Sequence, residues 1–73
     1  MIVVDSRGKK CPQPIIDLSR TLKSNPEVDS FHLLSDDIAT WSDLIAWSRM
    51  TGHSVQEIST ATFLIERGVA PKQ

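Results

Sequence analysis

The chain holds one cysteine, and the residues around it are those whose types and spacing could do chemistry. Cys11 follows Lys9 and Lys10 and precedes Pro12 and Pro14 in the stretch RGKKCPQP. A thiol reacts as its thiolate, and nearby positive charge favours that form. A single cysteine cannot form an internal disulfide, so the pattern indicates a nucleophilic thiol used in the reduced state.

The residues after the cysteine predict the helix that must position it. Pro12 suits the first position of a helix, where its fixed φ fits and its missing N–H is not needed. The apolar residues that follow share one helical face and predict a helix from about Pro12 to Lys23: Ile15, Ile16, Leu18 and Leu22. Cys11 is therefore expected to be solvent-exposed at the helix entrance. Pro12 and Pro14 would stiffen the backbone there, and the Gln13 amide would be a free donor near the sulfur.

Two opposing effects act on the pKa of the Cys11 thiol. The partial positive charge at the start of the helix would lower this pKa, and so would Arg7 and the two lysines. The helix start alone contributes about 0.3–1 kcal/mol. Asp36 and Asp37 follow the second predicted strand, at the same sheet edge as the thiol, and would raise it. The sequence does not decide between them; the expectation is a moderately activated nucleophile.

The remaining elements predict an α+β fold. Strands are expected at 2–5, 30–34, 54–58 and 62–66, with a turn at Thr60 and Ala61. SDD (35–37) supplies capping residues and first-turn acids for a second helix, which Gly52 ends as a left-handed cap. The order β-α-β-α-β-β predicts a two-layer sandwich, a four-stranded mixed sheet with two helices on one face. RGVAPKQ is expected to be a frayed tail, flexible from about residue 68.

Length and composition narrow the function. Seventy-three residues predict a single domain over 1–73, with a thin core and no deep cavity, so any function must use the surface. Residues 1–23 carry five basic and two acidic side chains, whereas residues 24–73 carry three basic and seven acidic ones. The net charge of −1 argues against stable nucleic-acid binding. With no apolar run long enough for a membrane span, a cytoplasmic protein is expected.

The other chemically capable side chains have simpler structural interpretations. His32 lies within a strand and His53 follows a helix end, so each is interpreted as structural rather than as a partner of the cysteine. One cysteine and two histidines at these spacings predict no metal site, and no cofactor is expected. Trp41 and Trp47, with Leu44 and Ile45 between them, are expected to form the apolar side of the second helix.

DSRGKKCPQP, followed by an amphipathic helix, resembles the D-x-R-G-x-x-C-P-x-P signature of the TusA/SirA family of sulfur carriers. The resemblance extends over nearly the whole chain. SDDIATWSDLIAWSRMTGHSV resembles the acidic turn, second helix and Gly-His corner of the family, and FLIER resembles its last strand. Three positions depart from the common pattern: Lys9 is usually apolar, Ile38 is often proline, and Ser48 is often a second cysteine.

The resemblance implies both a fold and a chemistry. The last strand would run antiparallel to the others. Cys11 would accept sulfur as a persulfide from a cysteine desulfurase or another persulfide donor and pass it to an acceptor protein. Thiolation of tRNA uridine is one such pathway; sulfur oxidation, cofactor assembly and selenium metabolism are others. Such a protein is a sulfurtransferase-type carrier rather than a turnover enzyme. It needs an exposed sulfur and a docking surface but no pocket.

Around Cys11, supporting and docking roles can be assigned. Pro12, Gln13 and Pro14 would orient the sulfur. Arg7, Lys9 and Lys10 would dock acidic partner surfaces and stabilise an anionic persulfide. Two alternatives remain: a regulatory protein-interaction module that does not need the thiol, and a thiol redox protein, which the single cysteine disfavours.

Overall fold

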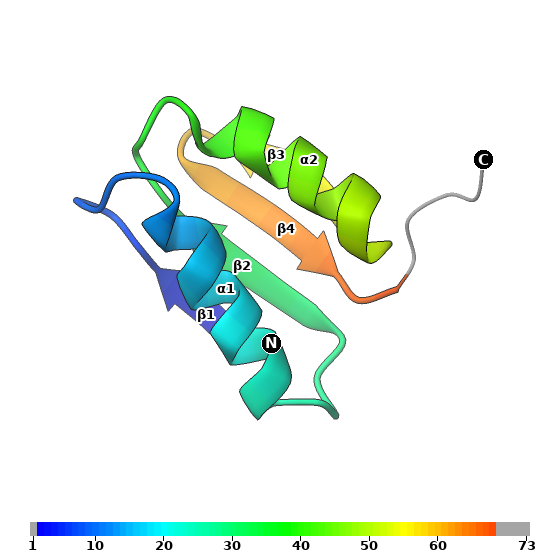
Figure 1. The fold of residues 1–73 in the computed structure, drawn as a ribbon. Coiled ribbons are helices and arrows are strands. Elements are labelled where there is room, and N and C mark those ends of the chain that lie inside the picture. Colours follow the sequence, from blue (N-terminus) through cyan, green and yellow to red (C-terminus); the bar gives the residue numbers. More distant parts are fainter. Residues whose placement is uncertain (1, 69–73) are drawn as a thin grey trace.

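A computed structural model describes residues 2–68 of the chain, and it has the predicted element order. The elements are β1 (Ile2–Asp5), α1 (Gln13–Ser24), β2 (Ser30–Leu34), α2 (Thr40–Thr51), β3 (Ser54–Ser59) and β4 (Thr62–Glu66). Both helices lie on one face of a four-stranded sheet (Figure 1). The predicted α+β sandwich is therefore confirmed.

The order of strands across the sheet is β1-β2-β4-β3. β1 pairs in parallel with β2, while β4 lies between β2 and β3 and runs antiparallel to both, as the family resemblance implied. Because β1 and β2 are parallel, their carboxyl ends lie at the same edge of the sheet. The loops that leave these two strands, residues 6–12 and 35–39, therefore meet there.

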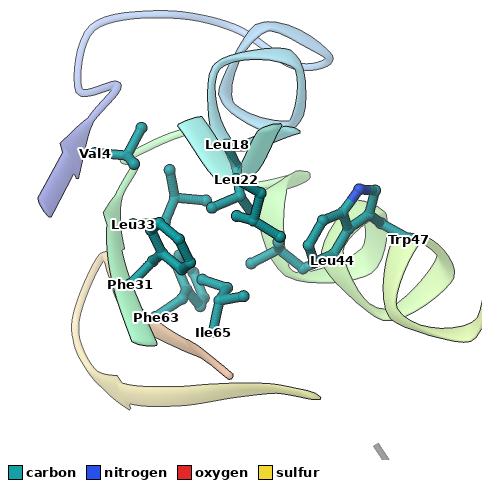
Figure 2. Packing of buried hydrophobic residues seen from close by; sticks show 9 residues of the cluster. All are labelled: Val4, Leu18, Leu22, Phe31, Leu33, Leu44, Trp47, Phe63 and Ile65. Carbon is teal, nitrogen blue, oxygen red and sulfur yellow. The ribbon is translucent and has the colours of Figure 1, made fainter. Parts of the chain in front are cut away.

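The core comes from alternate residues of the strands and one stripe of each helix. The two central strands contribute the register pairs Phe31–Ile65 and Leu33–Phe63. The nine buried apolar residues, shown in Figure 2, are Val4, Leu18, Leu22, Phe31, Leu33, Leu44, Trp47, Phe63 and Ile65. They fill the space between the sheet and the helices, so the core fixes both helices against the sheet.

The start of α1 differs from the prediction. Pro12 precedes the helix with φ −91° and ψ 15°, and the first helical residue is Gln13. A turn closed by the Gln13 N–H and the Lys10 carbonyl (3.0 Å) holds Pro12 outside the helix. Pro14 thus becomes the early-helix proline and is buried. The predicted apolar face is also wrong at Ile16, which is 38% exposed.

The second helix begins later than SDD predicts. Its first residue is Thr40, and its capping residue, Ala39, makes no side-chain cap hydrogen bond. Asp37 instead closes the preceding turn, since its Oδ1 accepts a hydrogen bond from the Ala39 N–H (2.8 Å). At the other end the prediction is confirmed: Gly52 has φ 81°, a left-handed conformation that glycine adopts without strain.

The expectation of a frayed segment from residue 67 is wrong at its first residue. The Arg67 guanidinium donates hydrogen bonds to the carbonyls of Leu22, Asn25 and Val28, at 2.9–3.0 Å. The Gly68 N–H donates to Nδ1 of His53 (2.8 Å). Residues 69–73 of the predicted tail lie outside the described residues.

The aromatic residues of α2 have structural contacts. Trp47 is buried and its Nε1 donates to the Ser19 hydroxyl on α1 (3.1 Å), which ties the two helices together. Trp41 stacks on Phe63, with ring centroids 5.8 Å apart. In residues 2–68, neither helix has the length and apolar character that crossing a membrane requires.

Candidate functional site

Two acidic side chains clamp the cysteine loop to the neighbouring loop. Asp36 Oδ1 accepts a hydrogen bond from the Gly8 N–H (3.0 Å), and Asp37 Oδ2 accepts one from the Cys11 N–H (3.1 Å). Gly8 has φ 82°, which favours glycine at this position. Hydrogen bonds from the Ala39 and Cys11 amides hold the pKa of Asp37 below its usual value. The prediction that both acids lie at the sheet edge with the cysteine loop is confirmed: Asp37 fixes the backbone of Cys11, and Asp36 fixes that of Gly8.

The thiol itself is less exposed than expected. Cys11 is half-buried, and its Sγ lies 3.5 Å from the Thr40 hydroxyl at the start of α2. Burial raises the pKa of the Cys11 thiol, and the Asp43 and Asp37 carboxylates raise it further; the Thr40 hydrogen bond acts in the opposite direction. The balance that the sequence left open therefore falls on the raised side, contrary to the expectation of a moderately activated thiol.

Gln13 does not serve the sulfur as predicted. Its backbone N–H is taken by the Lys10 carbonyl (3.0 Å), and its side-chain amide donates to Asp17 Oδ1 (2.8 Å). Pro12 and Pro14 flank it, the first exposed and the second buried, and the Cys11–Pro12 peptide bond is cis. Gln13 therefore ties the cysteine loop to Asp17 on α1 instead of donating to the sulfur.

Asp17 organises the inner side of the cysteine loop. Beside Gln13, its carboxylate accepts hydrogen bonds from the Ser6 hydroxyl (2.8 Å) and the Lys9 ammonium (3.0 Å). The Gln13 and Lys9 hydrogen bonds hold the pKa of Asp17 below its ordinary value. Helical periodicity predicts which residues share the apolar face but not which loop folds over the rest of the helix, so it does not reveal this role of Asp17.

The three residues of the predicted basic cluster, Arg7, Lys9 and Lys10, do not share one partner. Arg7 forms an ion pair with Asp5 (2.8 Å), and Lys9 pairs with Asp17 (3.0 Å). Within residues 2–68, Lys10 makes no ion pair closer than 4 Å. It is exposed, adjacent to the thiol in the chain, and close enough to Asp37 to help lower the pKa of that carboxyl. Lys10 therefore offers the most available positive charge of the three.

A shallow apolar groove of 280 Å³ runs between the two helices next to the cysteine loop. It is lined by Pro12, Ile15, Asp43, Ala46, Trp47 and Met50. Met50 is 83% exposed, so one wall is an unshielded apolar side chain. The surface beside the thiol therefore combines an apolar strip with one carboxylate.

No sequence pattern singles out Thr40 and Asp43 as neighbours of the thiol. They lie three residues apart in the first turn of α2, on the same side of the helix. That spacing was the available signal, but it does not show that this side faces Cys11. Only the packing of α2 against the cysteine loop brings them to the sulfur.

Replacing Asp17 by alanine is expected to lower the free energy of unfolding by about 1–3 kcal/mol, because its three donors lose their acceptor. Ser6 suffers most, since it is completely buried. Chemical denaturation at pH 7 measures the loss, and Glu27→Ala, at an exposed acid, is the matched control.

The effect of Asp17→Ala should depend on pH. A carboxyl whose folded pKa is lowered stabilises the protein above its unfolded pKa, and this stabilisation is lost as the pH falls. The ordinary value is 3.8, so the gap between wild type and Asp17→Ala should shrink below about pH 4. An unchanged gap at pH 3 would contradict an anionic role for Asp17.

Comparison with known proteins gives a consistent result. The family model described as Sulfurtransferase TusA matches residues 2–67. An Archaeoglobus fulgidus protein named "Putative sulfur carrier protein" is 34% identical over 58 residues, covering 80% of each chain. The Bacillus subtilis "Putative sulfur carrier protein YrkI" is 38% identical over 58 residues, covering 75% of this chain and 73% of the relative. The "Putative sulfur carrier protein YrkF" of that organism is 33% identical over 52 residues, covering 71% of this chain but 28% of the relative.

Proposed function

The chain belongs to the TusA family, and on that premise we propose that it is a sulfur carrier whose Cys11 accepts and delivers sulfane sulfur. The observation that carries the proposal is the place of the chain's single thiol. Cys11 is half-buried in a loop that two carboxylates clamp at the sheet edge, within the segment that matches the family. The sulfur is held in a fixed position but remains within reach of another protein.

Loading is a thiol–persulfide exchange. The Cys11 thiolate attacks the outer sulfur of a donor persulfide, the sulfur–sulfur bond of the donor breaks, and the donor cysteine leaves as a thiolate. Cys11 then holds the transferred sulfur as Cys–S–SH. In delivery, an acceptor thiolate attacks this outer sulfur, and Sγ of Cys11 leaves with the electron pair. No external oxidant or reductant is needed for either step.

Because the pKa of Cys11 is raised, the exchange requires a group that favours the thiolate. At neutral pH the free protein holds its sulfur mainly as the unreactive thiol, because burial and the Asp43 and Asp37 carboxylates disfavour the anion. A docked partner that brings a positive charge towards these carboxylates would favour the thiolate. We propose that Cys11 is used in the complex rather than in free solution.

The partners follow from this chemistry. The donor is a cysteine desulfurase or another persulfide-bearing protein, and the acceptor is a protein with a reactive thiol in the reducing cytoplasm. Thiolation of tRNA uridine is one pathway that such an acceptor would serve. The carrier itself needs no stable contact with nucleic acid.

Intact-mass measurement after incubation with a cysteine desulfurase and cysteine tests the proposal. One added sulfur atom, removed by a reducing agent, is the expected result. Partner binding without any added sulfur would instead support a regulatory interaction module, and the carrier function would then be rejected.

Lys10 is proposed to guide an acidic partner surface to the thiol. Lys10→Glu should slow sulfur transfer from a desulfurase by about two- to five-fold at low salt, with the deficit shrinking as salt screens exposed charges. Lys23→Glu makes the same charge change at the other end of α1 and should have a smaller effect. Alkylation of Cys11 by a neutral reagent separates docking from reactivity. Equal transfer rates for the two variants would show that Lys10 has no docking role.

A further inference from the structure

Two buried hydroxyl groups form a chain that ends at the sulfur of Cys11. The Ser35 and Thr40 side chains are 2% and 0% exposed. Ser35 Oγ lies 2.7 Å from Thr40 Oγ1, and Thr40 Oγ1 lies 3.5 Å from Cys11 Sγ. Within residues 2–68, the two hydroxyls make no other hydrogen bonds. Apart from each other, their one partner there is therefore the sulfur of Cys11.

Each hydroxyl has one proton to donate, and this favours one direction for the two hydrogen bonds. If Thr40 donated to Ser35, the proton of the buried Ser35 hydroxyl would have no acceptor among the described residues, which is costly. If Ser35 donates to Thr40, the Thr40 proton points to Sγ and both protons are placed. Consecutive hydrogen bonds with the same direction also strengthen one another. The arrangement therefore favours donation from Ser35 through Thr40 to the sulfur.

We propose that Thr40 donates a hydrogen bond to Cys11 Sγ whenever that atom bears negative charge, and that Ser35 positions the Thr40 hydroxyl for this role. Where it concerns transfer, the inference rests on the proposed sulfur-carrier function. Sγ is anionic at two points, as the attacking thiolate in loading and as the leaving thiolate in delivery. One hydroxyl thus stabilises the same atom in both directions of the exchange.

The groups around the sulfur disfavour its anionic form, so the anion depends on a hydrogen-bond donor such as Thr40. Asp37 from the adjoining loop and Asp43 from α2 both disfavour the anion, and burial has the largest effect in the same direction. Lys10, next in the chain, is exposed to solvent. The Thr40 hydroxyl lowers the pKa of Cys11 against these effects, and it is a fully buried donor already in position.

The first test uses the free thiol and no sulfur donor. The alkylation rate of Cys11 by iodoacetamide is measured against pH in wild type, Thr40→Val and Thr40→Ser. Thr40→Val keeps the shape but loses the hydroxyl, so the rate at pH 7 should fall by about three- to ten-fold. Thr40→Ser should behave like wild type. Thr51→Val, which removes a threonine hydroxyl at the far end of α2, is the matched control.

The sign of the change decides between two hydrogen-bond directions. If the thiol donates to Thr40, the hydroxyl stabilises the neutral form, and Thr40→Val would speed alkylation. A faster or unchanged rate would overturn the proposal. Ser35→Ala should slow alkylation less than Thr40→Val does, and a wild-type rate in Ser35→Ala would overturn the positioning role of Ser35.

Thr40→Val leaves the buried Ser35 hydroxyl unpaired, so its folding is checked by chemical denaturation. Should it not fold, the double variant Ser35→Ala/Thr40→Val removes both hydroxyls and leaves no orphan. The double variant is expected to show the same slow alkylation. A wild-type rate in a folded double variant would overturn the inference as a whole.

The second test follows delivery with cyanide as the acceptor. Cyanide takes the outer sulfur of the Cys11 persulfide as thiocyanate, and Sγ leaves as the thiolate. Thiocyanate should form about three- to ten-fold more slowly from persulfide-loaded Thr40→Val than from wild type or Thr40→Ser. Equal rates would overturn the leaving-group role. If wild type takes up no sulfur but the alkylation result holds, the carrier function fails while the hydroxyl contact at the thiol stands.

Discussion

Replacing Cys11 by serine is expected to abolish sulfur acceptance while the protein remains folded. Cys11 lies outside the buried apolar cluster, so the change should alter the free energy of unfolding by less than about 1 kcal/mol. A serine hydroxyl cannot form a persulfide, and the chain has no second cysteine to replace the thiol. Intact mass after incubation with a desulfurase and cysteine measures acceptance, and chemical denaturation measures stability.

Two outcomes would contradict this prediction. A sulfur adduct on Cys11→Ser would mean that sulfur is held elsewhere than on a cysteine. Loss of cooperative unfolding would mean that the thiol is structural. Ser48→Ala, in the second half of α2, is the matched control and should accept sulfur normally.

Replacing Arg67 by methionine is expected to lower the free energy of unfolding by about 2–3 kcal/mol. Its guanidinium donates to three carbonyl groups at and after the end of α1, and so ties this end of the helix to the residue that follows β4. It also lies over the Phe31 ring, 5.5 Å from the centroid. Methionine keeps much of the side-chain length but none of the donors.

Chemical denaturation of Arg67→Met measures this loss, with Arg49→Met on the exposed side of α2 as the control. Arg67→Lys should lie between wild type and Arg67→Met, because one ammonium cannot match the guanidinium fork. Alkylation of Cys11 should be unchanged, since the thiol lies beyond the other end of α1. Equal stability of Arg67→Met and Arg49→Met would show that the three hydrogen bonds contribute nothing.

Those elements set by local periodicity could be predicted from the sequence. The strands β1, β2 and β4 have the predicted bounds, and β3 ends one residue later than predicted. Gly52 ends α2 as expected. The predicted helix starts are less accurate, because Pro12 and Asp37 lie in tight turns that precede the helices.

The chemistry of the site was predictable only in part. The place of Cys11 between the lysines and prolines, at the sheet edge beside Asp36 and Asp37, follows from local pattern and from the parallel crossover. The contacts that the side chains make with one another do not follow from the local sequence. Thr40 meets Cys11 across 29 positions of sequence, and Arg67 meets Leu22 across 45.

The sequence by itself determined the order of the elements, the two-layer fold and the place of the chain's one thiol, which we propose as the sulfur-carrying group, because these depend on residue type and short-range period. Only the tertiary structure decided in which direction the pKa of that thiol is shifted. The pKa of Cys11 depends on its burial and on the groups that packing brings to it, Thr40 and Asp43 from α2 and Asp37 from the adjoining loop. Their effects fall steeply with distance, and that distance is set by how α2 packs on the sheet rather than by any neighbour of Cys11 in the chain.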